Sequence, residues 1–316
     1  MSAGNAGIFM PFVLALGYTT LLILLLGVAG QIYKKFKSRR HLDITDQWVV
    51  VTGCDSGIGQ GAVRALAKDG AKVVACCYTE TGANAALAAG ATWAPHFDLR
   101  DDDVLRDVAE QILAQSGGAL WCVVHAAGTV LPGFIDYQPI KFYRDVMAVN
   151  FFAPVLLTQK LLTALRRCRG RVIVVSSVDG IVSLPGNAPY DASKFAIEAY
   201  ADALRTELSL CGVGVSVINP ATMRTPMADA FFPGHRKTWT AMAAEEPEGD
   251  WQALWPESWL DQYVEKNTQQ LRSIAEDPAA AVNDIVHAAT AAHPKLRYLS
   301  GRLAKSLFYA LWLMPE

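Results

Sequence analysis

From residue 47 to residue 219, short continuous apolar runs alternate with longer stretches of helical periodicity. Apolar runs of this length predict strands buried on both faces, and they lie at 48–51, 72–77, 94–97, 120–125, 171–176 and 214–219. The helical stretches lie at 62–69, 104–114, 142–167 and 190–211. Buried strands joined by helices form a parallel sheet, and right-handed crossovers place helices on both of its faces. The chain is therefore expected to have an α/β fold with a doubly wound, Rossmann-type parallel sheet.

The turn after the first predicted strand is rich in glycine and reads Thr-Gly-Cys-Asp-Ser-Gly-Ile-Gly from residue 52 to residue 59. Glycines at such a turn let the backbone approach a pyrophosphate, and the N-terminus of the following helix favours an anion. A purely structural turn is the alternative, but a strand before and a helix after are the context that a dinucleotide site requires. The candidate cofactor contacts here are Gly53, Asp55, Ser56, Gly57, Ile58 and Gly59.

A tyrosine and a lysine, Tyr190 and Lys194, lie four residues apart and so share one face of a predicted helix. The ammonium group would stabilise a phenolate and lower the tyrosine pKa from its usual value of about 10. A general acid/base that works near neutral pH needs such a shift. Ser177 precedes the tyrosine by 13 residues, at the end of a predicted strand. Ser176 is an alternative to it on spacing alone, although the 13-residue interval favours Ser177.

These features resemble, in type and order, the motifs of the short-chain dehydrogenase/reductase family. The matching positions are the turn at 53–59, Asp98, the run 125–128, Asn150, Ser177, Tyr190, Lys194 and the stretch 219–225. The resemblance covers about residues 47–315. The Thr-Gly-Cys-Asp-Ser-Gly turn, the run 293–298 and the apolar C-terminus are similar to the membrane-bound retinol and hydroxysteroid dehydrogenase branch, and the 3-hydroxybutyrate dehydrogenases have a similar turn.

The resemblance implies a role for each of four catalytic residues. Tyr190 would exchange a proton with the substrate oxygen, while Lys194 would lower its pKa and bond the nicotinamide ribose. Ser177 would position and polarise the alcohol or carbonyl. Asn150 would hold a water that relays protons through Lys194, and its alternative role is to cap a kink. This set is chemically sensible, because charge builds on the substrate oxygen as hydride leaves the carbon.

Further cofactor contacts are implied at Asp98, Ala126, Ala127, Gly128, Tyr190, Lys194, Pro220 and Thr225. Asp98 would lie against the adenine, although it could instead be a helix N-cap. The chain departs from the family pattern twice. His125 stands where the family has asparagine, which puts the bracing of the central strands in doubt, and Ala221 follows Pro220 where glycine is usual.

The choice of cofactor rests on the end of the second strand, where NAD enzymes often carry an acid that binds the ribose hydroxyls. That place holds Cys77, followed by Tyr78 and Thr79, and no cation is present there for a 2′-phosphate. Ser56 rather than a basic residue precedes Gly57. NAD is therefore the preferred cofactor, with NADP as the alternative.

Composition limits the choice of partners. A net charge of −2 gives no reason to expect nucleic-acid binding. The six cysteines form no Cys-x-x-Cys pair, so reduced thiols are favoured over disulfides, and no metal site is expected.

An almost uncharged segment of 23 residues, 8–30, precedes the predicted domain. It is long enough to cross a bilayer core of about 30 Å. Five cations follow it, namely Lys34, Lys35, Lys37, Arg39 and Arg40. They would remain in the cytosol by the positive-inside rule. A signal peptide is disfavoured, because no basic residue precedes the segment and no convincing cleavage site follows; a monotopic hairpin remains an alternative.

We therefore expect a tail at 1–7, a single-pass anchor at 8–30, a basic linker at 31–46 and a catalytic domain at 47–316 that faces the cytosol. The resemblance implies the endoplasmic reticulum as the membrane. Within the domain, residues 226–276 break the strand–helix rhythm and hold four of the eight tryptophans. An ordered lid over an apolar pocket is expected there, with a homodimer or membrane contact as the alternative. The C-terminal residues 303–314 would lie on the membrane surface or pack on the core.

The sequence thus predicts a membrane-anchored oxidoreductase that acts on a lipophilic alcohol or carbonyl compound, such as retinol or a hydroxysteroid. One alternative is a dehydrogenase of small hydroxy acids, which would need cations around a substrate carboxylate. The other is a non-catalytic scaffold on the same fold, since a fold alone does not establish activity. The presence of both Tyr190 and Lys194 disfavours the scaffold.

Overall fold

The computed structural model describes residues 18–22, 24–28, 30 and 40–314. Its centre is a six-stranded sheet in which every neighbouring pair is parallel, in the order β2-β1-β3-β4-β5-β6. The strands are β1 (Trp48–Thr52), β2 (Lys72–Cys76), β3 (Cys122–His125), β4 (Arg171–Val175), β5 (Gly214–Pro220) and β6 (Arg297–Ser300). The strand order reverses between β1 and β3, which is where doubly wound sheets bind their ligands. The predicted fold class is confirmed for the sheet.

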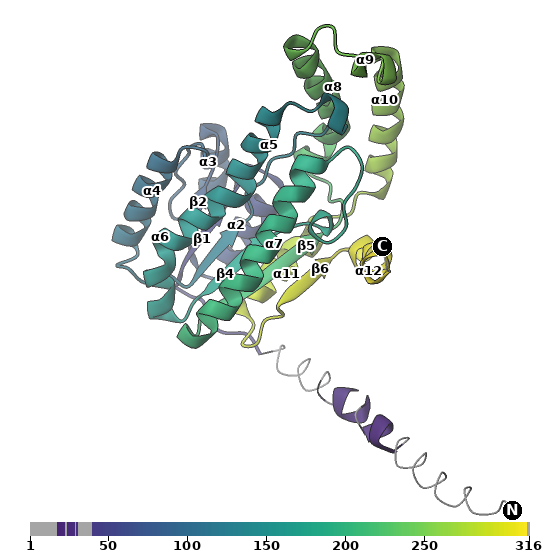
Figure 1. Cartoon of the computed structure of the whole chain (residues 1–316). Helices are drawn as coiled ribbons and strands as arrows, with labels where there is room; N and C mark the ends of the chain where they lie inside the picture. The colour runs from purple at the N-terminus through teal and green to yellow at the C-terminus, as the bar shows by residue number, and fades with distance from the viewer. Residues whose placement is uncertain (1–17, 23, 29, 31–39, 315–316) are drawn as a thin grey trace, which may run out of the picture.

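Helices cover both faces of this sheet (Figure 1). On one face, α2 (Gly57–Lys68) and α11 (Ala279–Thr290) pack against Val49, Val51 and Ile173. On the other face, apolar residues of three helices pack against Val50 and Val123. These helices are α4 (Asp102–Gln115), α6 (Ala153–Cys168) and α7 (Ala188–Leu208). The short α3 (Glu80–Ala88) follows β2, and the single turns η1 (Ile135–Tyr137), η3 (Val178–Gly180) and η4 (Ser209–Cys211) complete the domain.

Two predicted elements differ from the structure. No strand forms at 94–97; Trp93 and His96 make only isolated bridges to Val74 and Cys77. The proline between them, Pro95, has no amide to donate to a ladder, which explains why pairing stays local. The predicted helix at 142–167 is interrupted: α5 (Ile140–Met147) and α6 are joined by a π-helical turn, η2 (Ala148–Phe152). Pro154 in the first turn of α6 withholds one backbone donor at that junction.

Residues 226–276 are helical and form a layer beyond the carboxyl ends of the strands (Figure 1). The layer consists of α8 (Pro226–Glu245), α9 (Trp251–Leu254) and α10 (Glu257–Ile274). Aromatic rings join it to the loop after β3, since Phe134 stacks on Trp255 at 4.4 Å between ring centroids. The Tyr137 hydroxyl also lies 3.0 Å from His235 Nδ1 on α8.

The described part of the N-terminal segment, Tyr18–Val28 with a gap at residue 23, is helical, and its leucines are more than half exposed. Most of the predicted anchor, and Lys34 to Arg39 of the basic linker, lie outside the described residues. By length and apolarity, Ile140–Cys168 is the helical stretch that could cross a membrane among the described residues, but Leu157, Leu161 and Leu165 bury it in the core.

The C-terminal residues pack on the domain only at their start. Within η5 (Ala304–Phe308), Ala304 is fully buried against Val178 and Ala221. The helix α12 (Tyr309–Leu313) that follows is exposed along its whole length. Of the predicted C-terminal segment 303–314, only the first turn, around Ala304, therefore packs on the core.

Candidate active site

Two adjoining cavities lie at the carboxyl end of the sheet. The first, of about 640 Å³, is lined by the glycine-rich turn and by the residues after β2 and β3. The second, of about 290 Å³, is lined by Ser177, Tyr190 and Lys194 together with side chains of α8 and α10. The two cavities share Ile58, Ala126, Gly128, Thr225 and Met227. A ligand in the first cavity would therefore border a ligand in the second.

The glycine-rich turn packs so closely that side chains would not fit. Gly53 has a positive φ of 72°, and a Cβ atom there would lie 2.5 Å from Ala127 Cα. A Cβ atom on Gly59 would lie 2.2 Å from the carbonyl oxygen of Gly53. Ser56 gives α2 no side-chain cap, which leaves the first amides of that helix open toward the cavity side. This arrangement suits the pyrophosphate of a dinucleotide.

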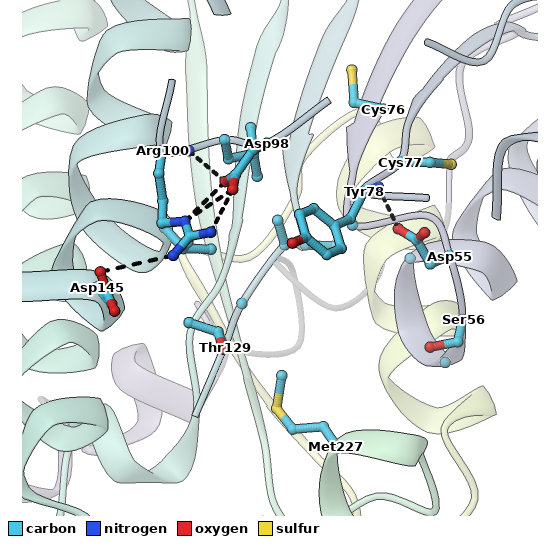
Figure 2. Close-up of a pocket in the computed structure, with 18 of the residues that line it drawn as sticks. Asp55, Ser56, Cys76, Cys77, Tyr78, Asp98, Arg100, Thr129, Asp145 and Met227 are labelled. Carbon is cyan, nitrogen blue, oxygen red and sulfur yellow. Dashed lines mark hydrogen bonds and ion pairs between the residues drawn. The ribbon is translucent and has the colours of Figure 1, made fainter. Parts of the chain in front are cut away.

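Asp55 links the turn to the residues that follow β2 (Figure 2). Its carboxylate accepts hydrogen bonds from the amides of Tyr78 at 2.8 Å and Thr79 at 2.9 Å, and from the Thr79 hydroxyl at 2.7 Å. A carboxylate therefore does lie beside the end of β2, where the sequence offered only the buried Cys77. The sequence assigned Asp55 to the cofactor site but missed this link, because the two segments are 23 residues apart.

Asp98 lines the cavity as predicted, but its carboxylate is already paired. Arg100 donates to both of its oxygens from Nε, at 3.1 and 3.0 Å, and also contacts Asp145 at 3.8 Å (Figure 2). The hydrogen bond from Arg100 lowers the pKa of Asp98. Sequence analysis overlooked three cations that line this cavity, namely Arg100, Lys141 and Lys237. They come from three separate elements, which is why no local motif revealed them.

Ser177, Tyr190 and Lys194 are brought together as predicted, but the electrostatics differ from the prediction. Burial raises the pKa of Tyr190, and the charge of Asp179 raises it further, while a hydrogen bond with Ser177 lowers it. Burial also lowers the pKa of Lys194 to about 8. Lys194 Nζ donates to the carbonyl oxygen of Val175 at 2.9 Å and lies 5.3 Å from the centroid of the Tyr190 ring. The expected lowering of the tyrosine pKa by this lysine is therefore wrong for the protein without ligand.

Asn150 lies in the π-helical turn and is 2 % exposed. Its Oδ1 accepts from the Thr129 amide at 2.8 Å, and its Nδ2 donates to the Thr129 carbonyl at 3.0 Å and to Ser193 Oγ at 2.9 Å. The side chain thus holds the loop after β3 against α7. A Cβ atom on Gly128 would lie within 3.7 Å of both Asn150 Oδ1 and Lys194 Nζ, so the two side chains border the same space.

His125 replaces the usual asparagine and binds a different neighbour. Its Nε2 lies 2.8 Å from Thr158 Oγ1, so the ring connects β3 to α6. Its Nδ1 is buried and has no partner among the described residues. Burial lowers the pKa of this imidazole to about 4, so the ring is neutral at physiological pH.

Polar residues surround Ser177; the sequence analysis included Asn219 in the stretch 219–225 but missed Asp179 and Asn187. Asn219 Nδ2 donates to the Ser177 carbonyl oxygen at 2.9 Å and also contacts Glu198, which pairs with Arg297 of β6. On the other side of Ser177, Asp179 and Asn187 line the second cavity. The only local signal was their short separation from Ser177 and Tyr190.

Comparison with known proteins shows that the chain is similar to short-chain dehydrogenases. A family model described as short chain dehydrogenase matches residues 47–235. The chain is 32% identical to bovine Dehydrogenase/reductase SDR family member 9, over 93% of this chain and 92% of that protein. It is also 32% identical to mouse Retinol dehydrogenase 7, over 89% of each chain, and 30% identical to mouse 17-beta-hydroxysteroid dehydrogenase type 6, over 90% of this chain and 89% of that protein.

A solved structure has the same fold. The short chain dehydrogenase/reductase of Burkholderia phymatum in complex with NAD superposes with a TM-score of 0.70 at 20% identity. The match covers 86% of this chain and 93% of that one.

Proposed function

Because this chain belongs to the short-chain dehydrogenase family, and so is an NAD(P)-dependent oxidoreductase that acts on CH–OH groups, we propose that it is a membrane-anchored dehydrogenase of lipophilic alcohols that prefers NAD. The observation that carries this proposal is the position of Ser177, Tyr190 and Lys194. They line an apolar-walled cavity that opens onto the dinucleotide cavity.

NAD(P), when bound, accepts or supplies the hydride at its nicotinamide ring. The residues of the chain handle the proton and the oxygen. The raised pKa of Tyr190 keeps its hydroxyl protonated at neutral pH, which suits donation of a proton to a carbonyl oxygen in reduction. In alcohol oxidation Tyr190 must first lose this proton to solvent, so that the phenolate can accept the proton of the alcohol. Ser177 lines the same cavity, and its single hydroxyl hydrogen can be donated to the same substrate oxygen. Asn150 and Lys194 both border the space beside Gly128, which lines both cavities.

The walls of the second cavity favour a lipophilic substrate. Phe231 and Phe232 of α8, Leu271 of α10 and Phe308 of η5 line it. Among the described lining residues, Lys194 is the single cation, while Asp179 contributes an acid. A small hydroxy acid would need cations for its carboxylate, so this cavity disfavours the hydroxybutyrate-type alternative. Helices α8–α10 supply much of the apolar wall, which supports the proposal that residues 226–276 act as a lid.

The test of this function is a steady-state assay of the purified full chain with NAD and NADP against retinoids, hydroxysteroids and short hydroxy acids. We expect turnover of at least one lipophilic alcohol and a higher kcat/KM with NAD. Turnover confined to hydroxy acids would refute the lipophilic substrate class, and a higher kcat/KM with NADP would refute the cofactor preference.

We also propose that the apolar segment 8–30 anchors the protein with its catalytic domain in the cytosol. The exposed leucines at 21–26 and the cations at 34–40 support this proposal. Full-length protein should stay in the membrane fraction after a carbonate wash, and a chain starting near His41 should not. Protease added outside intact microsomes should digest the catalytic domain. Protection of that domain without detergent would contradict the orientation.

A further inference from the structure

The polar end of the second cavity contains a side-chain network that hydride transfer does not use. Asn187 Nδ2 donates to Asp179 Oδ2 at 3.2 Å and to Asp191 Oδ1 at 2.9 Å. Asp191 Oδ2 accepts from the Leu184 amide at 2.7 Å, so both oxygens of Asp191 have partners within the protein. Asp179 is only partly buried and lines the cavity beside Ser177 and Tyr190. The network therefore presents Asp179 to a bound substrate.

The amide of Asn187 has its orientation fixed by its neighbours. Carboxylates only accept hydrogen bonds when ionised, so the NH₂ group must face Asp179 and Asp191, and the carbonyl oxygen must point elsewhere. That oxygen is buried and finds no donor in the described part of the chain. Asn187 is 2 % exposed and also lines the second cavity. Asn187 therefore acts through its NH₂ group, which holds the Asp179 carboxylate in place.

The network also touches the reaction centre and carries charge. Ser177 Oγ accepts a hydrogen bond from the Asp179 amide at 3.1 Å. The Asp179 carboxyl is attracted by the Lys194 ammonium. An anionic substrate group would be repelled by Asp179, and a cationic one by Lys194. A neutral hydrogen-bond donor fits both neighbours.

We propose that Asp179, held in place by Asn187, forms an acceptor subsite for a second, neutral hydroxyl of the substrate, close to the hydroxyl or carbonyl that reacts. This inference rests on the proposed function and narrows its substrate class to lipophilic diols and hydroxyketones. The apolar body of such a substrate would lie along Phe231, Phe232 and Phe308, which line the same cavity.

The test compares alcohols of one carbon skeleton that differ only in the second hydroxyl. The probes are 1-tetralol and the cis-1,2- and cis-1,3-diols of tetralin, oxidised with NAD by the full-length protein. Assayed above pH 7, where the Asp179 carboxyl with its pKa of about 7 is ionised, the wild type should favour one of the diols by about 10- to 100-fold in kcat/KM, as expected for a hydrogen bond to a charged group. Asp179→Leu should bring this ratio close to 1, and Asp179→Asn, which keeps an acceptor, should restore part of it.

Phe231→Leu alters the same cavity at a residue outside the Asp179 network and serves as the matched control, which should keep the wild-type ratio of the diol to 1-tetralol. The use of a ratio within each variant removes any general loss of activity. A wild-type ratio near 1, or one that Asp179→Leu leaves unchanged, overturns the subsite, while oxidation of 1-tetralol leaves the proposed function standing.

If no alcohol is oxidised, the proposed function fails and the subsite is decided by binding alone. Isothermal titration calorimetry of the NADH-bound protein with the same three probes gives the affinities. A preference for a diol that Asp179→Leu abolishes supports the subsite, and equal affinities overturn it.

Discussion

At the scale of single residues, the chemistry depends on how the protein holds the hydroxyl groups of Tyr190 and Ser177. Lys194 lies over the face of the tyrosine ring, and its Nζ atom is bonded to a backbone carbonyl. Burial is then the dominant influence on the tyrosine and raises its pKa. The spacing of Tyr190 and Lys194 predicted their proximity correctly, but the direction of the pKa shift depends on surroundings that spacing does not report.

Tyr190→Phe should abolish nearly all turnover, because it removes the proton donor and leaves the ring in place. We expect kcat to fall by about 100-fold or more, while NADH binding stays largely intact. Steady-state rates and a fluorescence titration with NADH measure the two quantities. Retention of more than about a tenth of the wild-type rate would rule out an acid/base role for Tyr190.

Asp55 is expected to disfavour NADP, since its carboxylate lies beside the end of β2, where a 2′-phosphate would approach. Asp55→Asn removes the charge and keeps an acceptor for Thr79. The ratio of kcat/KM for NADP over NAD should rise by about 10-fold. Asp69→Asn, which removes a charge at the far end of α2, is the control and should leave the ratio unchanged.

In NAD enzymes an acid often ends the second strand, the place that Cys77 holds here. An aspartate at position 77 would nevertheless not strengthen NAD binding in this protein. Cys77 is 3% exposed, and its thiol donates to the carbonyl oxygen of Ala75 at 3.6 Å. A carboxylate in that place would be buried beside the charge of Asp55. We therefore expect Cys77→Asp to lower the melting temperature, as measured by calorimetry, rather than to improve NAD binding.

At the scale of elements, the C-terminal helix α12 follows directly after a residue that lines the second cavity. Phe308 lines the second cavity, and Leu311, Trp312 and Leu313 of α12 are 39 to 63% exposed. An exposed apolar helix with Tyr and Trp rings is typical of segments that lie in a membrane interface. Lipophilic substrates could then enter the cavity directly from the bilayer.

A chain starting near His41, which lacks the N-terminal segment, should therefore still bind phospholipid vesicles weakly. Leu311→Asp combined with Leu313→Asp should reduce the bound fraction about 10-fold, because charges are expelled from the interface. Leu210→Asp changes a fully exposed leucine on another surface and is the control. Cosedimentation with vesicles measures the effect, and equal binding of both variants would show that α12 does not contact lipid.

At the scale of the whole molecule, buried ionisable groups oppose one another in their effect on stability. Burial lowers the pKa of His125 and His235 to about 4, and raises that of Asp179 to about 7 and of Asp191 to about 6. Between pH 4 and 6.5 the unfolded chain binds protons at the histidines, so their contribution to stability falls as pH falls. The carboxyls bind protons in the folded state, so their contribution rises as pH falls. The free energy of unfolding should change little over this range.

His125→Asn removes one of the two buried histidines whose contribution to stability falls as pH falls. Relative to the wild type, the variant should gain stability as pH falls from 6.5 to about 4, by about 1 to 3 kcal/mol over the interval. Urea unfolding of both proteins at a series of pH values gives the difference. A difference that stays constant with pH would mean that His125 is protonated equally in the folded and unfolded chains.

The sequence predicted the parallel sheet, the glycine-rich turn and the proximity of Ser177, Tyr190 and Lys194, because these depend on local periodicity and on short spacings such as that of Tyr190 and Lys194. Only the tertiary structure showed that Asp55 bonds the end of β2, that Arg100 pairs with Asp98 and Asp145, and that Asp179 and Asn187 line the substrate cavity. Those contacts join separate elements, and side-chain pKa values follow the burial that such contacts create. Burial is a property of the packed molecule, so no pattern along the chain could have given the direction of the pKa shift of Tyr190.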